Sequence, residues 1–228
     1  MLILKTDIPR EVAHTADTLE KAGYEAYLIG GCVRDLLIGK KPKDWDITTN
    51  ARPNEIVRLF QETYQNNDFG TVGIVNETDD TSLRIIEVTP YRVESGYSDA
   101  RRPDEVVFSN SLEEDLKRRD FTINAIAYSV SRETIVDQFG GQRDISQKRL
   151  RAVGNPVERF NEDALRMMRA VRLAVELNFV IDGDTMNAIA ENATNLKRIS
   201  KERIRDERIR RLNSDAPMQG IVLCEKLG

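Results

Sequence analysis

The chain has 228 residues, of which 40% are hydrophobic and 32% are charged, and its formal net charge is −4. This composition is typical of a globular protein with one large or two small domains, and the acidic excess argues against a protein that coats nucleic acid indiscriminately. Two cysteines far apart in the sequence, no secretory signal and no apolar run of membrane-spanning length favour a cytoplasmic protein with no membrane partner.

The first predicted elements are an amphipathic helix over residues 10–22 and a short buried strand over residues 26–29. Gly30 and Gly31 follow this strand, and helical spacing resumes over residues 33–38. Glycines let the backbone turn sharply and approach a ligand, and the free N–H groups at the start of the helix would then face that ligand. The pattern suits a phosphate site, although a strand followed by two glycines also forms an ordinary turn.

Asp44 and Asp46 begin an extended segment, so their side chains project to the same face of a strand. Two carboxylates on one face repel each other unless a cation lies between them, and a pair of Mg²⁺ ions is the usual occupant. The alternative is a solvated strand end. A glycine turn and an acidic pair within one strand–turn–helix–strand unit together favour nucleotidyl transfer.

The next elements are a helix over residues 54–62 and a hairpin of strands over residues 71–75 and 83–89. Glu87 lies on the second strand among β-branched neighbours. Taken alone, that strand favours an outward-facing, solvated glutamate. If the strand pairs beside Asp44 and Asp46, Glu87 is instead a third metal ligand. Residues 94–103 are polar and aperiodic, which indicates a mobile loop.

A cluster of charges and an amide, Arg118, Arg119, Asp120 and Asn124, precedes an apolar run. Arg119 is placed to hold a triphosphate or a ribose, and Asp120 to cap a helix. The alternative is a well-capped surface helix with no ligand.

From residue 161 onward the periodic segments are helical, over residues 161–177, 184–193, 200–212 and 218–227. The predicted fold class is therefore α+β: a head with a small mixed or antiparallel sheet and flanking helices, residues 1–150, followed by an all-helical neck, residues 151–228.

The helix predicted from residue 161 carries its apolar residues on one side, and its polar residues spread over the opposite arc. One interpretation is a solvated face with ion pairs at i,i+3 and i,i+4. The other is a reader of nucleobases. Cytosine and adenine both present an amine donor beside a ring-nitrogen acceptor, so Asp163 would accept from the amine and Arg166 would donate to the ring nitrogen. Uracil and guanine present the opposite polarity.

With these motifs in order, the chain resembles the class II tRNA nucleotidyltransferases, the family of bacterial CCA-adding, CC-adding and A-adding enzymes and the related poly(A) polymerases. The resemblance rests on a catalytic motif at residues 30–35 and 44–46, a ribose-side motif at 118–125, a nucleobase template at 162–166 continuing to 169 and 172, and a bracing motif at 199–204.

The resemblance implies a site residue by residue. It implies Mg²⁺ ligation by Asp44, Asp46 and Glu87 at a two-metal catalytic site. It implies nucleotide binding by Gly31, Arg34, Arg119, Asp120, Asn124, Glu162, Asp163, Arg166, Arg169 and Arg172. The implied reaction is template-independent addition of CMP, AMP or both from CTP and ATP to the 3′ end of tRNA.

Two further stretches bear on the branch of the family. The loop with Tyr97, Asp99, Arg101 and Arg102 resembles the loop implicated in switching from C to A addition and favours a CCA- or A-adding enzyme. Residues 68–72 resemble the tRNA-modifying branch rather than poly(A) polymerases.

Family members continue into further helical domains that grip tRNA, whereas this sequence ends at Gly228. We therefore expect complete nucleotide-binding residues but weak tRNA binding. The alternatives are a catalytically weak CTP- or ATP-binding module, a poly(A) polymerase-type enzyme, and a structural helical domain with a degenerate head. The oligomeric state stays open.

Overall fold

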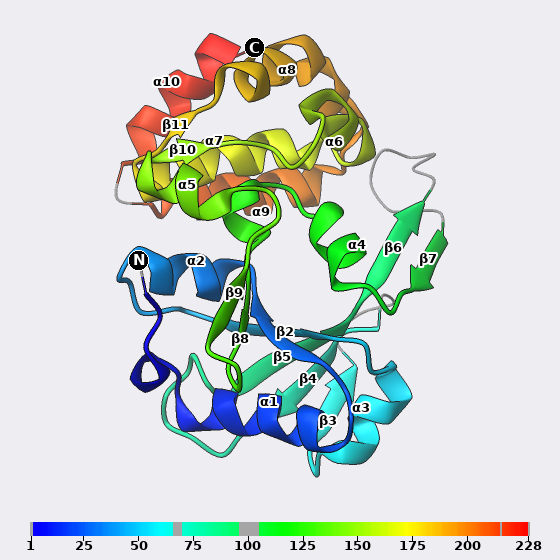
Figure 1. Cartoon of the computed structure of the whole chain (residues 1–228). Coiled ribbons are helices and arrows are strands. Elements are labelled where there is room, and N and C mark those ends of the chain that lie inside the picture. Colours follow the sequence, from blue (N-terminus) through cyan, green and yellow to red (C-terminus); the bar gives the residue numbers. More distant parts are fainter. Residues whose placement is uncertain (1, 66–69, 96–104, 215, 228) are drawn as a thin grey trace. The chain divides into compact units, whose positions relative to one another are not determined.

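The computed structural model describes residues 2–65, 70–95, 105–214 and 216–227 (Figure 1). The chain divides into two compact units. The first, called the head, consists of residues 1–93, 106–119 and 123–142; the second, called the neck, consists of residues 94–105, 120–122 and 143–228. The contacts within the chain place a boundary between residues 142 and 143 and assign residues 120–122 to the neck. The boundary after residue 150 stays a prediction.

A mixed sheet is the centre of the head. In the described part of the chain it has 7 strands in the order β3-β4-β5-β2-β1-β8-β9. The pairs are antiparallel except for β2 and β5, which run parallel. The strands are β1 (Ala26–Ile29), β2 (Trp45–Thr49), β3 (Thr63–Gln65), β4 (Val72–Val75), β5 (Ile85–Pro90), β8 (Ala127–Ser129) and β9 (Thr134–Val136).

The central strands supply much of the buried core of the head. All residues of β1 are buried, and Trp45 and Ile47 of β2 have exposed fractions of 1% and 0%. The predicted hairpin is confirmed as the antiparallel pair β4 and β5. A second pair, β6 (Arg92–Ser95) and β7 (Glu105–Phe108), flanks residues 96–104. The predicted loop residues Tyr97, Asp99, Arg101 and Arg102 lie outside the described residues, as do Asp68 and Phe69.

Short helices flank this sheet. The helices that begin in the head are η1 (Lys5–Asp7), α1 (Arg10–Lys21), α2 (Gly31–Leu37), α3 (Pro53–Leu59), α4 (Leu112–Lys117) and α5 (Gly141–Ser146), with η2 (Thr122–Asn124) at the return from the neck. The helix predicted over residues 54–62 was too long. It ends at Leu59, because Phe60 adopts an extended conformation and the chain leads into β3.

The neck is mainly helical. Its elements are α6 (Pro156–Glu162), α7 (Leu165–Leu177), α8 (Gly183–Asn192), η3 (Ala193–Arg198), α9 (Lys201–Leu212), α10 (Pro217–Leu227), and the two-residue parallel strands β10 (Arg149–Leu150) and β11 (Val180–Ile181). The short pair β10 and β11 is an addition to the predicted helical neck. In the described part of the chain, no helix is long and apolar enough to cross a membrane.

The single helix predicted over residues 161–177 is wrong. The chain breaks at Asp163, which has extended dihedral angles of φ −144° and ψ 103°. Its carboxylate accepts a hydrogen bond from the backbone N–H of Leu165 (3.0 Å), so it satisfies a free donor at the start of α7. Capping by a short polar side chain competes with helix continuation, and periodicity alone does not reveal this competition.

Buried Asp144 anchors residues 120–122 within the neck. Its carboxylate is fully buried and accepts hydrogen bonds from Thr122 Oγ1 (2.7 Å), Arg149 Nε (2.8 Å) and Arg151 Nε (2.9 Å). The backbone N–H of Thr122 also donates to the carbonyl oxygen of Arg151 (2.9 Å). A buried carboxylate with two arginines and a hydroxyl as donors has its charge compensated.

Candidate active site

The predicted glycine turn joins β1 to α2. Gly30 has a φ of +77°, in the left-handed region that favours glycine, and α2 begins at Gly31. A Cβ atom on Gly30 would lie 3.2 Å from Arg119 Nη1 and 3.8 Å from Asp46 Oδ2. A Cβ atom on Gly31 would lie 3.6 Å from Arg34 Nη2 and 3.8 Å from Asp44 Oδ1. The two glycines thus leave space beside both predicted acidic residues and two of the predicted arginines.

The pairing of β2 with β5 decides the position of Glu87. The two strands run parallel, with Asp46 directly opposite Glu87. Because neighbouring residues in register on adjacent strands point to the same face, Glu87 joins the face that carries Asp46. The sequence analysis made Glu87 a third metal ligand on the condition that its strand pairs beside Asp44 and Asp46, and this pairing meets that condition.

Negative charge is concentrated around Asp46. Burial raises the pKa of Asp46 to about 7, with further upward contributions from the charges of Asp44 and Glu87 and a downward one from Arg119. Among the described residues, however, no three side chains of the metal-binding types converge closely enough to hold a metal ion together. The chemistry of the three side chains nevertheless fits a hard divalent cation, because carboxylate oxygens are the ligands that such ions prefer and a bound cation would offset the charges that raise the pKa of Asp46.

Arg34 is held by two side chains of the head. Its Nε and Nη2 atoms donate to Asp35 Oδ1 (2.9 and 2.7 Å), and its Nη1 atom donates to Asn124 Oδ1 (2.8 Å). These bonds use three of the five N–H donors of the guanidinium. Arg34 and Asn124, 90 residues apart, are thereby brought together at the glycine turn.

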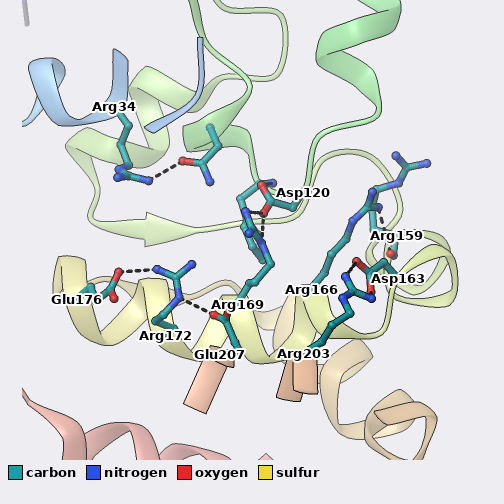
Figure 2. A network of polar contacts seen from close by, with 12 residues as sticks. Arg34, Asp120, Arg159, Asp163, Arg166, Arg169, Arg172, Glu176, Arg203 and Glu207 are labelled. Carbon is teal, nitrogen blue, oxygen red and sulfur yellow. Dashed lines mark hydrogen bonds and ion pairs between the residues drawn. The ribbon is translucent and has the colours of Figure 1, made fainter. Parts of the chain in front are cut away.

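Asp163 and Arg166, the predicted base readers, are each bound within the neck (Figure 2). Asp163 accepts from Arg203 Nη2 (2.7 Å) and Nη1 (3.3 Å). Arg166 pairs with Glu162, which also pairs with Arg159. Arg166 was predicted on the polar arc of its helix, and its exposed fraction of 9% shows that it is not part of a solvated face.

Arg169 and Arg172 are also paired within the neck (Figure 2). Arg169 Nε and Nη2 donate to Asp120 Oδ2 (2.8 and 2.7 Å). Arg172 pairs with Glu207, which is 5% exposed, and with Glu176 (2.8 Å). The Arg166–Glu162 and Arg172–Glu176 pairs have the i,i+4 spacing that the solvated-face interpretation expected. The pairs to Asp120 and Glu207 connect distant segments.

Sequence reasoning missed two buried acids, Asp115 and Asp144. Each is fully buried and each binds two arginines. A signal for Asp115 exists in the sequence, because Arg118 and Arg119 follow it at the i,i+3 and i,i+4 positions of a helix. No comparable signal marks Asp144, whose arginines lie on and after β10.

Two known protein families match parts of this chain. Residues 26–151 match the family described as Poly A polymerase head domain, and residues 178–228 match the family described as probable RNA and SrmB-binding site of polymerase A. The chain belongs to the poly(A) polymerase head-domain family. Both the family resemblance and the α+β fold predicted from the sequence are confirmed.

Its curated relatives include CCA-adding enzymes. Those of Levilactobacillus brevis and Lactiplantibacillus plantarum are 49% and 50% identical over 205 and 206 residues, each match covering 90% of this chain and 50% or 49% of the relative. The structure of the Bacillus stearothermophilus CCA-adding enzyme in complex with CTP is similar, with a TM-score of 0.85 and 39% identity over 96% of this chain and 53% of that one. This family member spans about half the length of the relatives it matches.

We predict that two glycine substitutions will separate backbone strain from an effect on the site. Gly30 and Gly39 both have left-handed φ angles, +77° and +73°, so Gly30→Ala and Gly39→Ala should each destabilise the fold by about 1–2 kcal/mol. A Cβ atom on Gly39 meets nothing within 4 Å, whereas one on Gly30 crowds Arg119.

Only Gly30→Ala should therefore weaken CTP binding, measured by isothermal titration calorimetry with urea unfolding as the stability measurement. Equal CTP affinity in the two variants would contradict a nucleotide site at this turn.

Proposed function

We propose that the chain carries the catalytic head and nucleobase-reading neck of a template-independent RNA nucleotidyltransferase that adds CMP, AMP or both to the 3′ end of tRNA. The observation that carries the proposal is the parallel register that sets Asp46 opposite Glu87, next to Asp44 and the glycine turn. The CCA-adding relatives at about 50% identity support the same activity. Since its substrates are tRNA and free nucleotides, the proposed location is the cytoplasm.

The proposed metal ligands are Asp44, Asp46 and Glu87, and the proposed cofactor is Mg²⁺. When bound, divalent ions would supply positive charge to the triphosphate and lower the pKa of the attacking hydroxyl. Support comes from the raised pKa of Asp46, which burial and two neighbouring carboxylates produce. A bound cation would offset the repulsion among these three neighbouring carboxylates.

The head residues are proposed to bind the nucleotide's phosphates and ribose. Arg34 keeps one N–H on each of Nη1 and Nη2 beyond its bonds to Asp35 and Asn124, and these can donate to phosphate oxygens. Arg119 brings a second guanidinium to the glycine turn. In the proposed reaction the 3′-hydroxyl of the RNA attacks the α-phosphorus, the bond to the bridging oxygen breaks, and pyrophosphate leaves.

The neck residues are proposed to choose the base. The Asp163 carboxylate has about four acceptor positions, and it accepts from the backbone N–H of Leu165 and from Nη1 and Nη2 of Arg203. One position on Oδ2 is left for the exocyclic amine of cytosine or adenine. Arg166, oriented by Glu162, would donate to the ring nitrogen. Asp120, Arg169 and Arg172 would hold the surrounding segments in place through their ion pairs.

A poly(A) polymerase-type enzyme is the second candidate, favoured by the description of the family that matches residues 26–151. The two candidates differ in the product. A CCA-type enzyme stops once the 3′ end is complete, whereas a poly(A) polymerase continues to add AMP.

The test is extension of tRNA transcripts that lack one, two or all three nucleotides of the CCA end, with radiolabelled CTP or ATP, Mg²⁺ and low salt. We predict additions that stop at the completed end. Long adenylate tails would support the poly(A) candidate, and Mg-nucleotide binding without any extension would support the binding-module alternative.

Asp46→Asn is the matched negative control for this assay. It keeps the side-chain shape but removes the charge, and we expect extension to fall by at least about a thousandfold, as loss of several kcal/mol of metal-dependent stabilisation requires. Its unfolding curve should stay close to that of the wild type. Near-normal extension by this variant would contradict the metal assignment.

We predict that Asp163→Asn will relax the choice of base. An asparagine at this position offers an amide N–H where the carboxylate offers a lone pair, and a good base contact contributes about 1–3 kcal/mol of discrimination. The incorporation of UTP and GTP relative to CTP should therefore rise about 5- to 150-fold.

The matched control is Asp206→Asn on α9, whose carboxylate also pairs with an arginine of the neck, Arg205, but is exposed. It should leave base choice unchanged. If Asp163→Asn excludes UTP and GTP as strongly as the wild type, Asp163 is an ion-pair partner of Arg203 and nothing more.

A further inference from the structure

Asp115, on α4, is a fully buried acid whose two oxygens have different partners. Oδ1 accepts from Arg118 Nε (2.9 Å) and Nη2 (2.6 Å). Oδ2 accepts from Arg119 Nη2 (3.3 Å) and from Thr48 Oγ1 (3.2 Å). Burial acts to raise the pKa of Asp115, but the charges of Arg118 and Arg119 outweigh it and hold that pKa below its ordinary value.

These contacts connect Asp115 to the face of the sheet that carries the acidic site. Thr48 lies two residues after Asp46 on β2, so both side chains project to the same face. Arg119 lies beside Gly30, and its charge acts on Asp46. Asp115 and Asp46 are therefore two carboxylates that attract the same guanidinium.

Arg119 also has a donor with no acceptor. Its Nε atom is buried and, among the described residues, makes no hydrogen bond. A buried donor left unpaired is costly, and its satisfaction by a bound anion would recover that cost. A phosphate group at the glycine turn is an anion of the right charge and acceptor chemistry.

We propose that Asp115 is a positioning residue that holds Arg119 back from Asp46 and presents it to the phosphates of the incoming nucleotide. A guanidinium free to pair fully with Asp46 would neutralise that carboxylate and occupy its own donors. By binding Nη2, Asp115 fixes the far end of Arg119 and leaves Nε and Nη1 for the ligand. This inference rests on the proposed function, because it assigns the anion as a nucleoside triphosphate.

Asp144 provides a matched control. Like Asp115, it is fully buried and binds two arginines and one threonine hydroxyl. Its arginines, Arg149 and Arg151, are not part of the proposed site. Asp115→Asn and Asp144→Asn therefore remove the same charge from the same kind of environment, and only the first acts on a ligand-binding arginine.

The experiment measures the affinity of the 228-residue chain for CTP with Mg²⁺ by isothermal titration calorimetry. Asp115→Asn should weaken CTP binding about tenfold, the lower end of what loss of a positioning partner costs. Asp144→Asn should change it less than about twofold while lowering the urea midpoint of unfolding to a similar extent.

A double-mutant cycle with Arg119→Met distinguishes positioning from a general structural role. If Asp115 acts through Arg119, Asp115→Asn should have no further effect on CTP affinity in the Arg119→Met background. Additive losses, an unchanged affinity in Asp115→Asn, or an equal loss in Asp144→Asn would each overturn the proposal.

If Asp115→Asn does not fold, Thr48→Val is the substitute variant for the same test. It removes the hydroxyl's contacts to Asp115 Oδ2 and to the carbonyl oxygen of Thr89. It should weaken CTP binding about threefold in the wild type and not at all beside Arg119→Met; equal effects in both backgrounds would overturn the proposal. Wild-type chain that binds no CTP would overturn the proposed function itself. CTP binding by the wild type without any change in the variants overturns only the role of Asp115.

Discussion

The parallel pairing of β2 with β5 is the constraint on which the rest of the site depends. It sets Asp46 opposite Glu87, and burial together with the charges of Asp44 and Glu87 raises the pKa of Asp46 to about 7. Such a concentration of negative charge is unfavourable unless positive groups compensate it. Arg34 and Arg119 both lie at the glycine turn, and the absence of a Cβ on Gly30 leaves room for Arg119. Each of these arginines is in turn bound by a further acid, Arg34 by Asp35 and Arg119 by Asp115.

In the neck, the arginines of α7 are also each paired with a carboxylate. Arg166, Arg169 and Arg172 of α7 bind acids from three other segments, which supply Glu162, Asp120 and Glu207. Arg203 of α9 binds Asp163 with two hydrogen bonds. Buried or half-buried ion pairs contribute little net stability, but they fix side chains in single orientations. Recognition of a base edge depends on such fixed orientations, because a carboxylate turned by one rotamer presents its lone pairs elsewhere.

Local sequence patterns were sufficient to predict the elements that depend on local chemistry. The strand, glycine pair and helix around Gly30 and the hairpin of β4 and β5 follow from periodicity and turn residues. The position of Glu87 did not follow, because strand register is set by contacts across the sheet, and the sequence left both alternatives open. The break at Asp163 was missed because capping by one side chain overrides an otherwise continuous helical pattern. Asp144 was missed for a third reason: its donors, Thr122, Arg149 and Arg151, meet only after the chain has folded.

The central claim is that carboxylates of β2 and β5 act together to bind divalent cations beside a nucleotide. Electron paramagnetic resonance with Mn²⁺ in place of Mg²⁺ tests it most directly, by counting the ions bound per chain in the presence of CTP. The wild type should bind a pair of Mn²⁺ ions, and Glu87→Gln, which removes the β5 charge alone, should lower the occupancy of that pair. A single Mn²⁺ carried by the nucleotide, with the same stoichiometry and affinity in Glu87→Gln, would contradict the account.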